Sequence, residues 1–168
     1  MTPTETEAAD ALQDHAVLWS VGEVTGGDVV DVACDALVAG LDTPGLRILA
    51  ACTYAEASYD VHDLLPAALH ELGLVFHPFE GEAGPEAAVR ALARRMLAGA
   101  FTPAEFTLRI HSRYGHEPPL TRRLAELDDE YETLEYGDRT VDEVDAEVMA
   151  LARNLAAHRP CPEAGWRP

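Results

Sequence analysis

Apolar residues recur at intervals of three and four along most of this chain, which is the spacing of an amphipathic α-helix. The pattern is clearest near the C-terminus, where the apolar positions are Val141, Val144, Val148, Leu151 and Leu155. No stretch shows the sustained alternation that is typical of a half-buried strand. The pattern therefore predicts an all-α fold, a single-domain bundle of about seven or eight amphipathic helices with short connections.

Helix start signals place three helices in the first part of the chain. The first is predicted over residues 5–21, after which glycines interrupt the pattern. The second is predicted over residues 28–41, with Asp28 as its N-cap because a side-chain oxygen there can accept hydrogen bonds from the first turn. Thr43 and Pro44 mark the third, since proline at the first helical position gives up no hydrogen bond.

The middle of the chain has the weakest helical pattern. A helix is predicted over residues 60–72, and Pro66 has to lie in its first turn or kink it. Residues 74–85 show no helical period. We therefore expect one helical domain over residues 1–158, in which any internal boundary falls at residues 74–85, followed by a loosely ordered proline-rich tail over residues 159–168.

Helix boundaries are marked more sharply in the second half. One helix is predicted to begin at Pro85 and to end at Gly99. Thr102 and Glu105 then have the spacing of a capping box, in which the two side chains each satisfy a backbone N–H group of the first turn. The helix that they start is predicted to end at Gly115, because glycine favours helix C-termini.

Residues 124–148 contain eleven carboxylates and one arginine. Their apolar positions predict two helices separated by Gly137, and Thr140 with Glu143 forms a capping box for the second. The acids lack the alternating ligands and central glycine of a calcium-binding loop, so no metal is predicted there. They are instead candidates for contact with a basic partner, and the candidates are Asp128, Asp129, Glu130, Glu132, Glu135 and Asp138.

Composition limits the classes of function. The chain has 168 residues, 48% of them hydrophobic, which suffices for a globular core. Thirty acidic residues outnumber twelve basic ones, all arginine, and the formal net charge is −18. Such a charge repels phosphate backbones and disfavours direct nucleic-acid binding. It can instead steer a basic protein towards the chain.

The cysteines and the N-terminus bear on location. Cys34, Cys52 and Cys161 fit neither a disulfide framework nor a metal motif, which indicates a reducing compartment. The N-terminal residues are acidic, unlike a secretory signal. No apolar run approaches the ~20 residues of a membrane span. We therefore predict a cytoplasmic protein that has no cofactor and does not enter a membrane.

Charge is distributed unevenly along the chain. Residues 1–89 carry a net charge of −15, residues 90–123 carry +5, and residues 124–168 carry −8. In one interpretation the central arginines pair with the acidic helices, within the fold or across a homodimer. In the other, carboxylates left over after such pairing form a face for a cationic partner. The central arginines are Arg90, Arg94, Arg95, Arg109, Arg113, Arg122 and Arg123.

Four histidines are candidate metal ligands: His62, His70, His77 and His116. His62 and His70 are eight residues apart, whereas a zinc-binding helix places two histidines four apart. His77 lies beyond a predicted helix end, and His116 follows a helix C-terminus, where the helix dipole by itself favours histidine. No metal site is therefore predicted, and no catalytic residue is identified.

Two stretches combine helix ends and capped restarts in a particular order. Residues 36–74 read ALVAGLDTPGLRILAACTYAEASYDVHDLLPAALHELGL, and residues 93–115 read ARRMLAGAFTPAEFTLRIHSRYG. They resemble a type of small bacterial protein without assigned function, which has a helix, a GLDSP-like restart and a capped helix ending in ELG, and later a glycine followed by a Pro-Glu-capped helix. The resemblance implies an all-α fold and implies no activity.

These observations support two functions of different classes. An acidic, compact chain without a catalytic motif is predicted to be a cytosolic protein-binding module, such as an immunity or inhibitor protein that masks a basic partner. The alternative is a small helical-bundle enzyme or ligand-binding protein that uses histidine and carboxylate side chains. Its candidate histidines are His62, His70, His77, His111 and His116.

Overall fold

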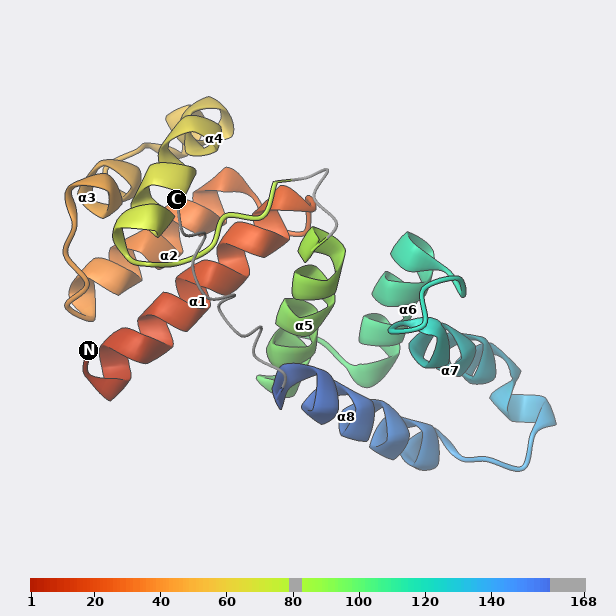
Figure 1. Cartoon of the computed structure of the whole chain (residues 1–168). Helices are drawn as coiled ribbons and strands as arrows, with labels where there is room; N and C mark the ends of the chain where they lie inside the picture. The colour runs from red at the N-terminus through yellow and green to blue at the C-terminus, as the bar shows by residue number, and fades with distance from the viewer. Residues whose placement is uncertain (79–82, 158–168) are drawn as a thin grey trace, which may run out of the picture. The chain divides into compact units, whose positions relative to one another are not determined.

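The computed structural model describes residues 1–78 and 83–157. Eight α-helices and one 3₁₀-helix form the regular structure of these residues, and no strand occurs among them. The prediction of an all-α fold is therefore confirmed. Figure 1 shows the helices in chain order.

The chain divides into two compact units, Met1–Ala88 and Val89–Pro168. The division falls just beyond residues 74–85, the stretch in which the sequence allows an internal boundary within the predicted single domain. The first unit contains α1 (Pro3–Ser20), α2 (Gly26–Val38), α3 (Pro44–Ala50), α4 (Tyr54–Glu71) and the start of α5 (Ala83–Leu97). The second contains the rest of α5, α6 (Pro103–Tyr114), α7 (Arg122–Thr133), η1 (Leu134–Tyr136) and α8 (Val141–Ala157). The tail predicted over residues 159–168, with Cys161, lies outside the described residues.

The first unit is organised around α2. This helix packs against α1, α3 and α4, and α3 packs in turn against α4. Side chains from all four helices are fully buried in one hydrophobic cluster, among them Leu12, Val29, Leu46, Leu65 and Leu69. Complete burial of each such side chain contributes about 1.5–3 kcal/mol. The apolar cluster is therefore the main attraction between these helices.

The start of α2 differs from the prediction. Its N-cap is Thr25, whose Oγ1 accepts a hydrogen bond from the backbone N–H of Asp28 at 3.3 Å. The Asp28 carboxylate accepts one in return from the backbone N–H of Thr25 at 2.7 Å. The prediction that Asp28 caps the helix was therefore wrong: aspartate here completes a capping box from the third helical position.

The start of α4 was also predicted too late. The helix begins at Tyr54 rather than at residue 60, because Thr53 and Glu56 form a capping box. The backbone N–H of Thr53 donates to the Glu56 carboxylate at 2.8 Å, and that of Glu56 donates to Thr53 Oγ1 at 3.3 Å. Pro66 lies in the interior of this helix and not in its first turn.

In the second unit, α7 packs against α6 and α8, and α6 also packs against α8. The three helices bury large apolar side chains completely, including Phe106, Ile110, Leu124, Leu127 and Val148. These residues fix which sides of α6, α7 and α8 turn inward. The polar residues on the remaining sides form the clusters described below.

The capping residues of α6 and α8 in the second unit are those predicted from the sequence. Thr102 and Glu105 form the capping box of α6, and Gly115 ends that helix with a φ of +62°, a value that favours glycine. Thr140 and Glu143 form the predicted box before α8. The acidic run thus becomes α7, η1 and the first half of α8. Among the helices of the described ranges, none combines the length and the apolar character of a membrane span.

Candidate functional site

Two arginines connect carboxylates of α7 and α8. Arg123 donates through Nε to Glu147 at 2.7 Å, and through Nη1 to Glu130 at 2.9 Å and to Glu126 at 3.1 Å. Arg139 lies in the connection before α8. It donates to the second oxygens of Glu130 and Glu147 at 2.6 and 2.8 Å. We refer to these five residues as the ion cluster.

The ion cluster perturbs its own members. The hydrogen bonds from Arg123 and then Arg139 hold the pKa of Glu147 below its ordinary value. The hydrogen bond to Glu147, together with those to the other glutamates, raises the pKa of Arg123. The side chains of Arg123 and Glu147 are 40% and 33% exposed, so water screens part of this attraction. The ion cluster therefore makes only a modest contribution to the stability of the contact between α7 and α8.

Pairing between arginines and acidic helices within the fold is seen at Arg123, while its companion Arg139 comes from the acidic segment itself. Arg90 donates to the backbone carbonyl of Leu155 in α8 at 3.3 Å. Arg109 lies over the ring of Phe101, 5.2 Å from its centroid. Three further arginines that were predicted to pair with the acidic helices lie on α5 and α6: Arg94, Arg95 and Arg113.

Two histidines and an aspartate meet where α6 ends beside α7. His111 lies in the last turn of α6, and His116 follows the terminating Gly115. Their rings approach edge to face, with centroids 4.6 Å apart. Asp129 on α7 places Oδ1 3.7 Å from His111 Nδ1 and Oδ2 3.2 Å from His116 Nε2. One ligand atom from each of the three residues lies within 4.8 Å of the other two.

Asp128 supports this arrangement from the interior. It is 8% exposed, and its Oδ1 accepts a hydrogen bond from Thr107 Oγ1 at 3.3 Å. Its Oδ2 lies 2.9 Å from His111 Nδ1. A buried carboxylate is costly without such partners, and these contacts also restrain the imidazole ring. We refer to His111, His116, Asp128 and Asp129 as the His–Asp cluster.

The six carboxylates predicted to contact a partner lie in three environments. Asp128 and Asp129 belong to the His–Asp cluster, and Glu130 belongs to the ion cluster, so their oxygens are engaged within the unit. The other three are exposed: Glu132, Glu135 and Asp138. A role in partner binding stays a prediction for these exposed residues, whereas burial removes Asp128 from such a surface.

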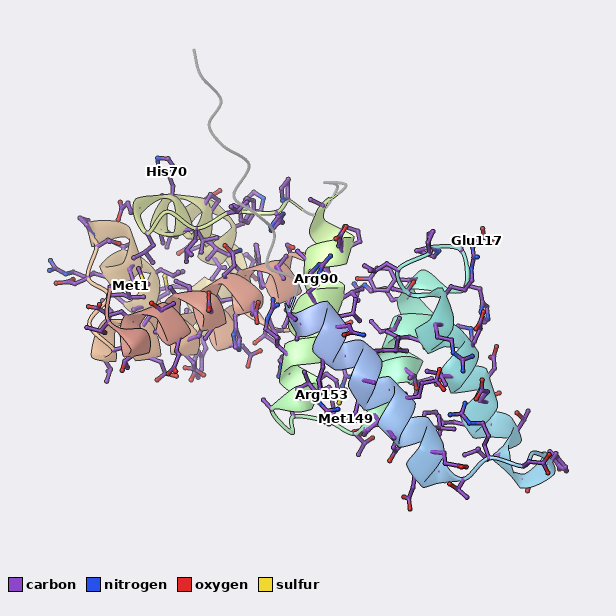
Figure 2. All side chains as sticks on the ribbon, turned by 60° about the horizontal axis from the view of Figure 1, so that its bottom comes forward. Met1, His70, Arg90, Glu117, Met149 and Arg153 are labelled. Atoms are coloured by element: carbon purple, nitrogen blue, oxygen red, sulfur yellow. The ribbon has the colours of Figure 1, made fainter. Side chains whose placement is uncertain are left out.

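The histidines considered as metal ligands separate in the structure. His62 contacts the neighbouring Asp63 at 3.2 Å. His70 projects outward from α4 (Figure 2). His77 is half-buried, and burial lowers its pKa. Across residues 1–78 and 83–157, His116 is the one of these four whose ligand atom converges with those of two further residues.

A polar hollow of about 350 Å³ lies on the first unit between the N-terminal ends of α2 and α4. We call it the acidic hollow, and its lining residues are Thr25, Gly26, Gly27, Asp28, Asp31, Tyr54 and Ser58. The Tyr54 hydroxyl donates to Asp31 at 2.7 Å, which raises the pKa of Tyr54. The Tyr54 side chain is 64% exposed. The hollow thus presents a carboxylate next to an accessible aromatic ring.

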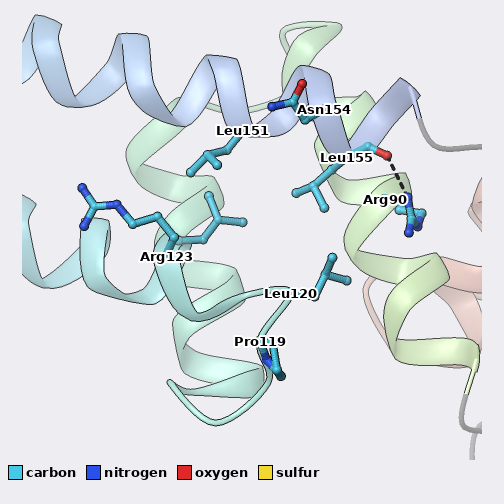
Figure 3. A pocket seen from close by; sticks show the side chains of 8 residues that line it. Arg90, Pro119, Leu120, Arg123, Leu151, Asn154 and Leu155 are labelled. Carbon is cyan, nitrogen blue, oxygen red and sulfur yellow. Dashed lines mark hydrogen bonds between the residues drawn. The ribbon is translucent and has the colours of Figure 1, made fainter.

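A second pocket, of about 380 Å³, lies on the second unit beside α7 and α8 (Figure 3). Its walls include Leu120, Leu151 and Leu155, with Arg90 and Arg123 at its edge. Arg90 is bonded to the Leu155 carbonyl, and the guanidinium of Arg123 belongs to the ion cluster. The lining therefore offers apolar contact rather than the convergent polar groups that orient a specific ligand.

Sequence analysis missed the convergence of His111 with Asp129. One signal was available: the connection from Gly115 to the next helix is short, and short connections favour antiparallel neighbours. The end of α6 is then expected beside the first turns of α7, where two consecutive aspartates stand.

Comparisons with known proteins identify no relative from which a function could be inferred. A scan against protein-family models finds no match to the chain, and searches of curated proteins and of solved structures find none either. The functional conclusions below therefore depend on the residues and geometry of this chain.

Proposed function

We propose that this protein is a binding module for a basic protein, which it engages through the first unit. The observation that carries the proposal is the charge of that unit. Residues 1–88 contain sixteen carboxylates and one arginine, whereas residues 89–168 contain fourteen carboxylates and eleven arginines. The net charges are −15 and −3. The single arginine, Arg47, is bonded to Asp42 at 2.5 and 2.6 Å, so it offsets one carboxylate.

Several carboxylates of the first unit are held in the ionised state. Hydrogen bonds from the backbone of Thr2 and of Thr53 lower the pKa values of Glu5 and Glu56. The hydrogen bond from Arg47 lowers that of Asp42. Since each of these pKa values is lowered, the groups are charged at neutral pH. Their charge is a permanent feature of the surface that meets a partner.

The acidic hollow is the proposed point of attachment. A guanidinium or ammonium group of the partner would contact Asp31 and lie against the Tyr54 ring, where charge-assisted hydrogen bonding and cation–π attraction act together. The same two helices expose Asp35 and Asp60. The net charge of the unit would steer the partner towards this site before contact and accelerate association at low ionic strength.

A basic toxin or enzyme that has to be masked in the cytoplasm is the class of partner that suits this surface. Acidic inhibitors bind such targets quickly because complementary charges guide their encounter. The proposal thus makes the protein an immunity or inhibitor protein, and it assigns no reaction to the chain.

The test is binding to basic products of neighbouring genes, and to an arginine-rich peptide, at low and high salt. The variant Asp31→Asn/Asp35→Asn/Asp60→Asn removes three charges from the first unit. The matched control, Glu132→Gln/Glu135→Gln/Asp138→Asn, removes three from the second. Since exposed charge pairs contribute about 0.2–1 kcal/mol each, we expect the first variant to weaken binding about tenfold and the control less than about twofold.

Other outcomes would contradict the proposal. Equal losses in the two variants would mean that only net charge matters, and no particular surface is used. A larger loss in the control would move the surface to the exposed acids of the second unit. Absence of binding to every basic protein at low salt would remove the binding function itself.

A further inference from the structure

The backbone at the end of α6 brings two histidines together. Gly115 terminates the helix with a φ of +62°, a conformation that other residues adopt only with strain. The chain turns there, so that His116 returns to His111 and the two ring centroids lie 4.6 Å apart. The pairing of the imidazoles therefore follows from the helix terminus.

The third member of the group comes from a different helix. Asp129 on α7 approaches both imidazoles, at 3.7 Å from His111 Nδ1 and 3.2 Å from His116 Nε2. Atoms that bind one zinc ion at about 2.0–2.2 Å lie within roughly 4 Å of one another. The observed separations of at most 4.8 Å require only a small side-chain adjustment to reach that geometry.

We propose that His111, His116 and Asp129 bind one divalent transition-metal ion, and that zinc is the ion. Two imidazole nitrogens and one carboxylate oxygen suit zinc and its neighbours, whereas calcium and magnesium prefer sites made of oxygen alone. The side chains are 28%, 46% and 54% exposed. Three protein ligands that face solvent leave a coordination position for water or another molecule, as in zinc sites of the catalytic type.

Asp128 is the positioning residue of this site. Metal-bound imidazoles commonly hydrogen-bond to a carboxylate, which fixes the ring and makes the ligand more basic. Asp128 contacts His111 Nδ1 and is itself held by Thr107, so Nε2 is the nitrogen of His111 that is left to bind the ion. Two consecutive aspartates thus have separate tasks, because Asp128 restrains a ligand from the interior and Asp129 reaches the ion from the surface.

The site is independent of the proposed partner-binding function. Its residues all belong to the second unit, while the acidic hollow belongs to the first. Loss of zinc binding would leave the charge of the first unit unchanged, so the two proposals fail in different experiments.

The experiment is calorimetric titration of the untagged full chain with zinc chloride. We expect one zinc ion per chain. Asp128→Asn should weaken binding about 10- to 100-fold, the usual effect of losing the partner of a metal ligand. His116→Gln and Asp129→Asn should weaken it further, because each removes a ligand. The control His62→Gln/His70→Gln removes two imidazoles from the first unit and should bind zinc within about twofold of the unmodified chain.

Two readouts separate zinc binding from loss of structure. His116 and Asp129 are exposed, so their variants should keep the helical circular dichroism of the unmodified chain. Cobalt(II) substituted for zinc should give the visible absorption of a histidine-bound ion, and His116→Gln should abolish it. Zinc affinity that is unchanged in His116→Gln, an equal loss in the control, or the absence of zinc binding to the unmodified chain would each overturn the proposal.

Discussion

The two units place their carboxylates in different structural roles. In the first unit, Glu5, Asp28 and Glu56 each complete a capping box with a threonine three residues earlier. The second unit has such boxes too, but it also joins helices through carboxylates that are shared between arginines. There Glu130 and Glu147 share two arginines. A cap stabilises one helix end, whereas a shared arginine fixes two elements relative to each other.

This difference shows that the density of acids along a sequence does not measure the charge available to a partner. Residues 124–148 hold eleven carboxylates, yet several of them contact arginine or histidine. The acids of residues 1–88 are more dispersed in the sequence, but they meet only one arginine in their own unit. The two units therefore differ in formal net charge mainly because they differ in arginine content.

The largest expected effect concerns a close backbone contact in the first unit, between α2 and α4. A Cβ on Gly26 would collide with the backbone carbonyl of Ala57 in α4. We expect Gly26→Ala to lower the free energy of unfolding by about 1–3 kcal/mol, since neither backbone can give way easily. Urea denaturation followed by circular dichroism measures this change.

Gly27 provides the matched control for that prediction. A Cβ there would lie 3.2 Å from Cδ1 of Tyr54, whose exposed side chain can move aside. Gly27→Ala should therefore change the stability by less than about 1 kcal/mol. Equal losses at the two positions would show that the approach of α2 to α4 does not require glycine at Gly26.

The second prediction removes an arginine from each unit. Arg123→Met deprives two shared glutamates of one partner and should lower the free energy of unfolding by about 1–2 kcal/mol, less than for a fully buried pair because water reaches the cluster. Arg47→Met breaks a pair whose side chains are 64% and 54% exposed, and should leave the stability unchanged. Urea denaturation at low and high salt measures the free energy of unfolding of both variants.

High salt should reduce the difference in free energy of unfolding between these two arginine variants, since it screens exposed charges. A loss for Arg47→Met as large as that for Arg123→Met would contradict the comparison. It would mean that the first unit depends on the Arg47–Asp42 pair as much as the second depends on its ion cluster.

Local signals explain which helix ends were predictable. The boxes at Thr102 and Thr140 combine threonine with glutamate three residues later, and both starts were predicted correctly. The same spacing occurs at Thr25 and Thr53. There the starts were placed too late: Asp28 is itself a good cap residue, and Pro66 is unfavourable in a helix interior. The capping contacts and burial further along each helix outweigh these competing signals.

The His–Asp cluster was beyond such local reasoning. Helical periodicity predicts α6 and α7 but not the rotation of one helix about its axis relative to the other. Asp128 shows the consequence, since it was grouped with outward carboxylates and is in fact 8% exposed. Thr107 and His111, from the other helix, provide the partners that make its burial tolerable. Only tertiary packing brings these residues together.

The smallest expected effect is the loss, at acidic pH, of the stability that the ion cluster contributes. Hydrogen bonds from Arg123 and Arg139 hold the pKa of Glu147 below its ordinary value of 4.5. A carboxyl group with a lowered pKa in the folded state stabilises the fold above its unfolded pKa, and this stabilisation is lost as the pH falls through the folded value. Glu147→Gln should therefore cost about 1 kcal/mol at pH 7, and its difference from the unmodified chain should shrink below about pH 4.5.

Urea denaturation at a series of pH values tests this expectation. Glu132→Gln removes a carboxylate from the exposed side of α7 without breaking a hydrogen bond of the ion cluster, and it should keep the stability of the unmodified chain at pH 7. If the curves for Glu147→Gln and the unmodified chain stay parallel into acid, the ionised glutamate contributes nothing to holding α8 on α7. The apolar core of the second unit would then account for that contact alone, and the two units would differ in net charge but not in how they are stabilised.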